Sequence, residues 1–381
     1  MKISILTPNL SANCAGRAYF LARILQRHYK TEIVGPMLGN QIWQPIAHDK
    51  NITYKIVEVN RSGNLFKYVK CFARKISGNI LYASKPLFPS FGVGLIIKLL
   101  DGKPLVLDID DWELGFIKEN IHSLSFRNRL NVLSPYVKTL LFEKLSKLTG
   151  EITVSNRFLE KKFSGTVVWS GRDTDLLDPR KFNRATIRKK YGIAEDERVV
   201  MFFGTLRIHK GIEDLVEAVN LIKNPRITLT IVGIDYHNPY NTDVSKSAKK
   251  LLNKRYKEFG MQPFQKIPEF LAMADIVAIP QKKNLATIGQ IPAKVFDAMA
   301  MEKAIIATEV SDLPEILNGC GYIVEPDNPK ELASAIQYIL SHDSELKEIG
   351  QKARQKCVEK YSWDAIENTL QQIFQKYEKR P

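Results

Sequence analysis

The sequence has few cysteines, and their arrangement suggests neither a metal site nor a disulfide framework. The four are scattered along the chain without CxxC or Cys/His ligand spacing: Cys14, Cys71, Cys320 and Cys357. Unpaired thiols are typical of proteins in a reducing compartment. We therefore expect no disulfide and a cytoplasmic location.

Long hydrophobic runs are also missing. The longest apolar stretch, residues 88–100, is interrupted by proline, by two glycines and by Lys98. It is too short and too broken to span a bilayer. The chain opens directly on a strand-like run at residues 2–6, so we expect no signal peptide. Both features favour a cytoplasmic protein.

Acidic residues are absent between Glu58 and Asp101, where seven lysines and arginines fall. The whole chain has a net charge of +15, which implies an anionic partner such as nucleic acid, an acidic membrane or a phosphorylated substrate. Within this window, segment 64–77 has a helical pattern, with an apolar face of Leu65, Val69, Phe72 and Ile76 and cations opposite at Lys67, Lys70 and Arg74. Such a helix either lies on anionic lipid or packs on a sheet with a solvated outer face.

The pattern that is present throughout is an alternation of short β-rich runs with helical segments. It predicts an α/β fold with parallel sheets, and 381 residues favour two domains over one. We expect the first over residues 1–178 and the second over residues 179–362. We expect two doubly wound, Rossmann-like domains that face a central cleft, with ligands at the carboxyl ends of their strands.

One motif is typical of phosphate binding. Residues 202–211 read FFGTLRIHKG, an apolar strand followed by a turn with two cations, Arg207 and Lys210, and then by a helix. A helix amino terminus offers free N–H groups to phosphate, and the two cations would stabilise charge on a departing diphosphate. Taken alone, the same cations are equally typical of a solvated strand–helix loop.

A second motif follows about ninety residues later. Residues 288–297 read IGQIPAKVFD, in which glycine and proline start a helix and Asp297 lies on its first turns. A carboxylate there can accept both hydroxyls of a ribose, although alone it would suit a helix dipole. With the first motif it predicts a nucleotide-sugar site formed by Gly204, Thr205, Arg207, Lys210, Gly289, Gln290, Ile291, Lys294 and Asp297.

A third group follows the buried strand 105–109. Asp110 and Asp111 come where a parallel strand ends, with Glu113 close behind. One of the two aspartates is a candidate catalytic residue that orients the acceptor hydroxyl or takes its proton. Two alternatives are a Mg²⁺ or Mn²⁺ site and caps for a helix that begins at Trp112. We expect no metal, because the cationic clamp already neutralises a diphosphate.

These residues carry a resemblance. Residues 198–363 are similar to the carboxyl-terminal half of the retaining GT-B glycosyltransferases of family 4, the glycosyl transferases group 1; the similar segments are 203–211, 268–280, 298–308 and 361–363. The resemblance implies a GT-B fold in which the first domain, 1–178, binds the acceptor and the second, 179–362, binds the nucleotide sugar. It also implies that the last helix, 363–381, packs back onto the first domain. It also implies metal-independent transfer with retention, in which Arg207 and Lys210 hold the departing diphosphate. No cofactor is expected beyond the nucleotide-diphosphate sugar.

The first half of the chain resembles the family more weakly. The loop after the first strand stands where the family often has a glycine-rich turn near the sugar, which places Asn13, Gly16 and Arg17 on the acceptor side. The motifs also depart from the family. Of its two glutamates eight positions apart, the second is Asp297 here and the first is Gly289. Thr205 stands where an arginine usually follows the strand glycine, and we take Arg207 in its place.

We therefore predict a hexosyltransferase-like glycosyltransferase that moves a sugar from a nucleotide-diphosphate sugar to an acceptor hydroxyl. A lipid-linked or cell-envelope glycan, handled at the inner face of the membrane in polysaccharide biosynthesis, would account for the basic window. Two alternatives are a basic nucleic-acid- or membrane-binding protein without catalysis and a nucleotide-sugar epimerase of the same fold. The chain has no recognised nucleic-acid module and the basic window no aromatic stacking platform, so no nucleic acid is expected.

Overall fold

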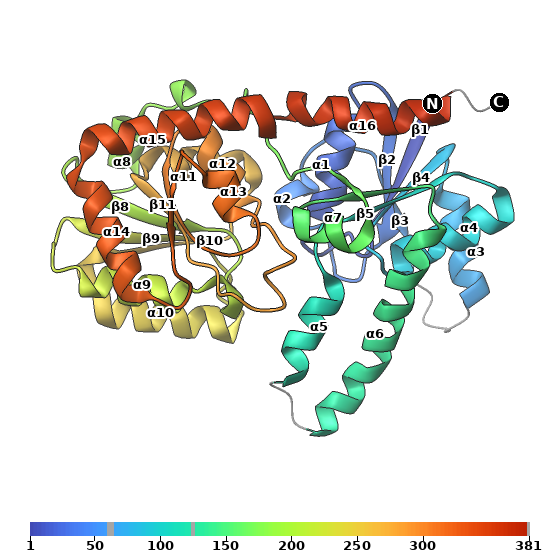
Figure 1. The fold of residues 1–381 in the computed structure, drawn as a ribbon, viewed down its shortest axis with the longest axis horizontal. Helices are drawn as coiled ribbons and strands as arrows, with labels where there is room; N and C mark the ends of the chain where they lie inside the picture. The colour runs from blue at the N-terminus through green and yellow to red at the C-terminus, as the bar shows by residue number, and fades with distance from the viewer. Residues whose placement is uncertain (59–64, 123–125, 379–381) are drawn as a thin grey trace. The chain divides into compact units, whose positions relative to one another are not determined.

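The computed structural model describes residues 1–58, 65–122 and 126–378, with only the backbone given for 122 and 126–131. The chain divides into two compact units, Met1–Ser170 with Ile366–Pro381, and Gly171–Ala365. Each is an α/β unit with a parallel sheet (Figure 1). The sequence placed the boundary between residues 178 and 179, whereas the second unit begins at Gly171.

The first unit is a seven-stranded sheet in the order β3-β2-β1-β4-β5-β6-β7, with every pairing parallel. Its strands are β1 Lys2–Leu6, β2 Lys30–Pro36, β3 Tyr54–Val57, β4 Ile80–Ser84, β5 Leu105–Ile109, β6 Glu151–Val154 and β7 Thr166–Val167. The order reverses between β1 and β4. At such a switch point the loops after the two strands diverge, which leaves room for a ligand at their carboxyl ends.

The helices of this unit are α1 Ala15–Leu25, α2 Gln44–Ala47, α3 Leu65–Lys75, α4 Val93–Asp101, α5 Glu113–His122, α6 Phe126–Leu145 and α7 Arg157–Phe163. Helices α5 and α6 lie side by side and extend away from the sheet (Figure 1). The final helix, α16 (Trp363–Glu378), packs in the same unit, where the ring of Phe374 contacts Tyr29 and Tyr82.

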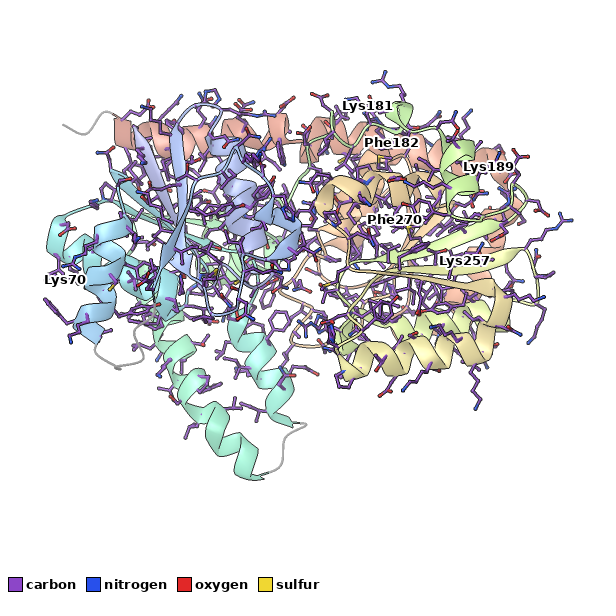
Figure 2. All side chains as sticks on the ribbon, turned by 180° about the vertical axis from the view of Figure 1, so that it is seen from behind. Lys70, Lys181, Phe182, Lys189, Lys257 and Phe270 are labelled. Carbon is purple, nitrogen blue, oxygen red and sulfur yellow. The ribbon has the colours of Figure 1, made fainter. Side chains whose placement is uncertain are left out.

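The apolar face of α3 is used inside the unit. Val69, Phe72 and Ile76 are buried, and Figure 2 shows Lys70 on the outer side of the helix. The packed interpretation of this segment is therefore confirmed for these side chains, because a face that covers a sheet is not free to enter lipid. Residue 64 of the predicted segment lies outside the described residues. Within the described ranges, we find no helix long and apolar enough to cross a bilayer.

The second unit is a six-stranded parallel sheet in the order β10-β9-β8-β11-β12-β13. Its strands are β8 Arg198–Phe203, β9 Ile227–Ile234, β10 Tyr256–Gly260, β11 Ile276–Ile279, β12 Ala304–Thr308 and β13 Tyr322–Val324. Its helices are α8 Arg184–Lys190, α9 Ile212–Leu221, α10 Pro239–Leu252, α11 Ile267–Met273, α12 Lys294–Ala300, α13 Leu313–Leu317, α14 Pro329–Ser341 and α15 Asp343–Lys356. The switch point here lies between β8 and β11.

The sequence explains this second sheet well. Strand β9 is buried at all eight positions and β11 and β12 along their whole length, as expected for parallel strands covered on both faces. Helix α9 buries Ile212, Leu215 and Val219, a spacing of three and four residues that gives one apolar stripe. The result is a rigid sheet whose carboxyl edge holds the loops after β8 and β11.

Candidate active site

The turn after β8 brings backbone and side chains unusually close together. Gly204 has φ +100° and Gly211 has φ +64°, both in the region that favours glycine. A Cβ on Gly204 would lie 3.4 Å from Lys294 Nζ, and one on Gly211 would lie 1.8 Å from the carbonyl oxygen of Pro280. The two glycines therefore let the β8 loop approach both α12 and the end of β11.

Lys210 lies in the short helical turn between β8 and α9. Its Nζ donates to Oε1 of Gln281 at 3.3 Å and to Oε1 of Gln290. Gln281, which follows β11, is fully buried, and its Nε2 has no hydrogen-bond partner in the described part of the chain. The switch point of this sheet therefore holds a cation and an unsatisfied amide donor.

Lys294, the first residue of α12, adds a second cation. Its Nζ lies 3.4 Å from the centre of the Phe202 ring, is buried, and has no hydrogen-bond partner among the described residues. Burial, and then the charge of Lys210, lower the pKa of Lys294 well below its usual value, against the opposing effect of Asp297. A buried ammonium without an acceptor is costly, so this arrangement suits a site that receives an anion.

Asp297, predicted to bind a ribose, has a protein partner. Both of its carboxylate oxygens accept from the guanidinium of Arg172, with Nη2 3.0 Å from Oδ2. Arg172 is itself fixed through its backbone, which pairs with Tyr361 and Trp363 at 2.9 Å each. The sequence did not point to Arg172, because nothing local marks it. The ribose contact of Asp297 stays a prediction.

The structure brings only part of the predicted nucleotide site together. Gly204, Lys210, Gln290 and Lys294 form one group, because Gly204 lies beside Lys294, Lys210 donates to Gln290, and the charge of Lys210 acts on Lys294. Thr205 and Arg207 are exposed, and no described contact joins the side chain of Arg207 to Lys210. The remaining two, Gly289 and Ile291, are buried in the loop that leads to α12.

In the first unit, the predicted aspartates surround a lysine that the sequence did not single out. Lys85 follows β4, and its Nζ lies 2.9 Å from Asp110 Oδ1, 2.8 Å from Asp111 Oδ2 and 2.6 Å from Glu113 Oε1. Its side chain is 7% exposed. An ammonium thus occupies the position between the carboxylates that a divalent cation would need.

These groups shift one another's proton affinity. Burial raises the pKa of Asp110 to about 7, the charge of Lys85 opposes this, and the neighbouring carboxylates of Asp111 and Asp108 add to it. For Lys85, burial disfavours the charge, but the three carboxylates around it hold its pKa well above the usual value. Asp110 is therefore the group at this edge whose charge changes near neutral pH.

Arg17, predicted on the acceptor side, is buried and pairs with Asp108. Its Nε lies 2.9 Å from Oδ2 and its Nη2 2.8 Å from Oδ1, while Nη2 also donates to the carbonyl of Val168. This pair ties α1 to the end of β5. Asn13 is exposed, and a Cβ on Gly16 would touch the Trp43 ring at 3.0 Å. What these three contribute to acceptor binding stays a prediction.

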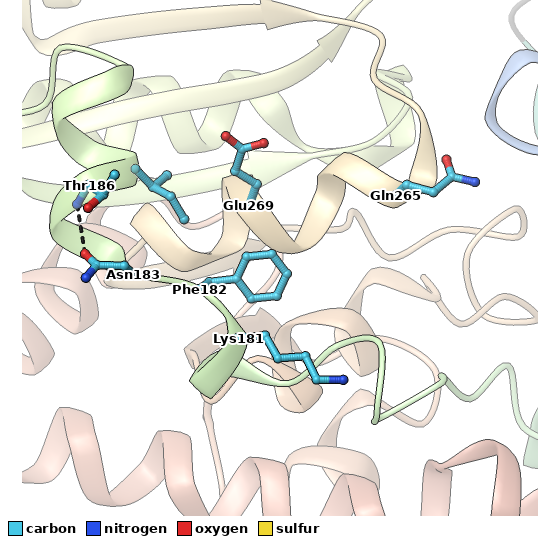
Figure 3. Close-up of a pocket in the computed structure, with 7 residues that line it drawn as sticks. Lys181, Phe182, Asn183, Thr186, Gln265 and Glu269 are labelled. Atoms are coloured by element: carbon cyan, nitrogen blue, oxygen red, sulfur yellow. Dashed lines mark hydrogen bonds between the residues drawn. The ribbon is translucent and has the colours of Figure 1, made fainter.

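A hollow of about 290 Å³ lies elsewhere on the second unit, between segment 181–187 and the start of α11 (Figure 3). It is lined by Lys181, Phe182, Asn183, Thr186, Ile187, Gln265 and Glu269. The Asn183 side chain accepts from Thr186 N and so caps α8. None of the predicted site residues lines this hollow, and the switch-point groups remain the candidate site.

Comparison with known proteins bears on the class of protein. Residues 183–356 match the family model described as Glycosyl transferases group 1. An uncharacterized glycosyltransferase of Methanocaldococcus jannaschii is 25% identical over 298 residues, which cover 74% of this chain and 72% of that protein. The lipopolysaccharide 1,2-N-acetylglucosaminetransferase of Salmonella typhimurium is 29% identical over 191 residues, 47% of this chain and about half of that protein.

Among solved structures, that of Anabaena Alr3699/HepE in complex with UDP-glucose has a TM-score of 0.78 at 17% identity, covering 99% of this chain and 100% of that one. This likeness confirms the fold class: two Rossmann-like units of the GT-B type. With the matching family model, it supports a GT-B glycosyltransferase.

Proposed function

We propose that this protein transfers a sugar from a nucleotide-diphosphate sugar to an acceptor hydroxyl, with the donor diphosphate held in the second unit. The observation that carries the proposal is Lys294, a buried ammonium beside Lys210 that has no hydrogen-bond acceptor in the part of the chain that the structure describes. A diphosphate offers the acceptor oxygen that the Lys294 ammonium does not find among the described residues, and its charge suits the neighbouring Lys210. The solved neighbour with UDP-glucose adds support for this class of donor.

The chemistry follows from where charge develops. The bond between the sugar and the diphosphate breaks, so negative charge grows on the diphosphate oxygens. In this proposal Lys210, Lys294 and the Nε2 group of Gln281 meet that charge, together with the first N–H groups of α9, which begin just after Gly211. Each such donor in a site shielded from water contributes roughly 2–4 kcal/mol to stabilising a transition state.

We assign the acceptor to the first unit, with Asp110 or Asp111 orienting its hydroxyl. The acceptor oxygen then bonds to the anomeric carbon as the diphosphate leaves. Its proton passes to the departing diphosphate. Attack on the face from which the diphosphate leaves would retain the configuration and needs no enzyme nucleophile. Lys85 fills the space among the carboxylates, which favours transfer without a metal.

For the acceptor we propose a lipid-linked or cell-envelope glycan, reached from the cytoplasmic face of a membrane. Two features of α3 support a membrane contact: the cations on its outer side, and Leu65 and Phe66, which are 54% and 73% exposed at its start. Co-sedimentation with vesicles of anionic and of neutral lipid tests this part separately. Equal recovery with both lipids would remove the membrane from the proposal.

The test of the donor is a calorimetric panel of UDP, GDP and ADP with their common sugars, with and without Mg²⁺. We expect one nucleoside diphosphate to bind without metal. Incubating the bound nucleotide sugar without acceptor separates the two enzyme classes. An epimerase would convert the sugar into its epimer on the nucleotide, whereas a transferase would slowly hydrolyse the donor to free sugar and nucleoside diphosphate. Duplex or single-strand affinity with no nucleotide binding would instead support the nucleic-acid alternative and refute the proposal.

A further inference from the structure

Lys85 has a backbone conformation that few lysines adopt. Its φ is +70°, in the left-handed region, which costs energy for any residue with a Cβ. Three hydrogen bonds hold it there: its N–H donates to the carbonyl of Asp108 at 2.7 Å, and its own carbonyl accepts from the N–H of Leu87 at 2.8 Å and from Ser90 Oγ at 3.0 Å. Strain of this kind persists where the surroundings enforce it, and it often marks a functional site.

The position of Lys85 in the sheet supports such a role. It follows β4, one of the two strands at the switch point of the first unit, and the carboxylates follow β5, which pairs with β4. The strained backbone therefore directs a buried ammonium to the edge of the sheet where ligands bind in this type of fold.

A purely structural salt bridge explains this arrangement poorly. One ammonium faces three carboxylates, so the group keeps an excess of negative charge, and buried ion pairs are weak sources of stability. The nearby Arg17–Asp108 pair, one cation with one carboxylate, is the balanced arrangement that a structural role requires. Within the described part of the chain, Oδ1 of Asp110 accepts no hydrogen bond, so the unbalanced group leaves this oxygen available to an incoming donor.

We propose that Lys85 is a positioning residue of the acceptor site, which holds the carboxylate of Asp110 in the orientation and charge state that accept a hydrogen bond from the acceptor hydroxyl. This inference rests on the proposed function. Lys85 does not touch the reacting atoms in this scheme. It acts through Asp110, whose ionised form it favours.

The expected pH dependence follows from all the charged groups that face Asp110: Lys85 after β4, Asp108 on β5, Asp111 and Glu113 beyond it, and Arg17 and the Cys14 thiol at the start of α1. Replacing Lys85 by methionine removes the main charge that lowers the pKa of Asp110. Burial and the other carboxylates then act with only Arg17 against them. The pKa of Asp110 rises, and the acid limb of a reaction that needs its carboxylate moves to higher pH.

The experiment measures sugar transfer by the full chain from the nucleotide sugar selected by the binding panel to neutral alkyl glycosides. Slow hydrolysis of the donor is measured as a second activity. Lys85→Met, Lys85→Arg and the control Lys50→Met, an exposed lysine of the same unit, are compared from pH 5 to pH 9. We expect Lys85→Met to lower kcat at least tenfold at pH 7 and to shift the acid limb upward, with donor binding unchanged. Lys85→Arg keeps the charge and should return the limb to its original position.

Two results would overturn the inference. One is an unaltered pH profile in Lys85→Met, whatever its melting temperature. The other is a limb in Lys85→Arg displaced as far as in Lys85→Met. If Lys85→Met does not fold, an NMR titration of Lys85→Arg with carbon-labelled aspartate tests the inference. The midpoint of the Asp110 carboxyl signal must then stay near that of the wild type. Loss of nucleotide binding by the wild type itself would refute the proposed function instead.

Discussion

Replacing Lys294 by methionine tests the donor site most directly. Methionine has nearly the length of lysine and no charge, so it fills the space over the Phe202 ring without leaving a cavity. Because the ammonium has no hydrogen-bond acceptor among the described residues, its removal costs them no hydrogen bond. We expect the variant to be as stable as the wild type or more so, and to bind a nucleoside diphosphate more weakly.

The size of the loss can be worked from the contact that the ligand would make. A hydrogen bond to a charged partner contributes about 1.5–3 kcal/mol. At about 1.4 kcal/mol for each factor of ten, the dissociation constant should rise roughly 10- to 150-fold. A smaller change would mean that the phosphate oxygens lie nearer to Lys210 than to Lys294.

The pH dependence gives a second and independent check. The pKa of Lys294 lies well below its usual value in the free protein, and an adjacent diphosphate raises it again. Between those two pKa values, binding takes up a proton, so wild-type affinity falls as the pH rises through that window. The methionine variant has no such proton, and its affinity should change less with pH.

Calorimetry measures both effects when it is run at two pH values in buffers of different ionisation enthalpy. Lys283→Met, an exposed lysine of the preceding loop, serves as the matched control and should bind like the wild type. If Lys294→Met binds the nucleotide as tightly as the control and with the same proton uptake, the reasoning from the unpaired ammonium is refuted.

Three further predictions concern stability. Arg17→Met should destabilise the chain by about 3–5 kcal/mol in urea unfolding, because it leaves Asp108 buried and uncompensated; a second change, Asp108→Leu, should recover most of that loss, and no recovery would contradict the pairing argument. Since burial raises the pKa of Asp110 from 3.8 to about 7, the stability of the wild type falls as the pH rises between those values. Asp110→Asn should therefore be more stable than the wild type at pH 8, by at most about 4 kcal/mol, but not at pH 4. An equal gain at both pH values would exclude titration of Asp110 as the cause. Gly211→Ala should lose at least about 2 kcal/mol, from its positive φ and the 1.8 Å approach to the Pro280 carbonyl, and an unchanged melting temperature would show that the turn relaxes freely.

Most of the fold could be predicted because its signals are local. Parallel strands buried on both faces are continuous apolar runs, as in β9, and the covering helices have one apolar stripe each. Because these signals are local, the sequence could not decide between two interpretations of α3. Its pattern is the same whether the apolar face meets a sheet or a lipid surface. Only the structure shows that Phe72 packs in the core while Leu65, on the same predicted face, is exposed.

The nucleotide site could be predicted only where one loop carries it. Gly204, Lys210 and Gly211 lie within a single strand–turn–helix, so their proximity follows from the motif. Gln281 and Arg172 are brought in by the sheet order and by the pairing of distant segments, which no local pattern reveals. Arg207 lies in the same loop with an exposed side chain, and its contact with a phosphate stays a prediction.

Lys85 shows the limit of sequence analysis most clearly. The sequence shows the lysine and the acidic residues, but not that they lie together in the fold. The lysine was one of seven cations in an acid-free window and looked like part of a basic surface. Its three carboxylates come twenty-odd residues later, after the next strand. What unites them is the parallel pairing of β4 with β5, which brings the carboxyl ends of consecutive strands to one edge. A cation directly after one buried strand and acids directly after the next therefore deserve to be considered as a single site whenever both strands belong to one sheet.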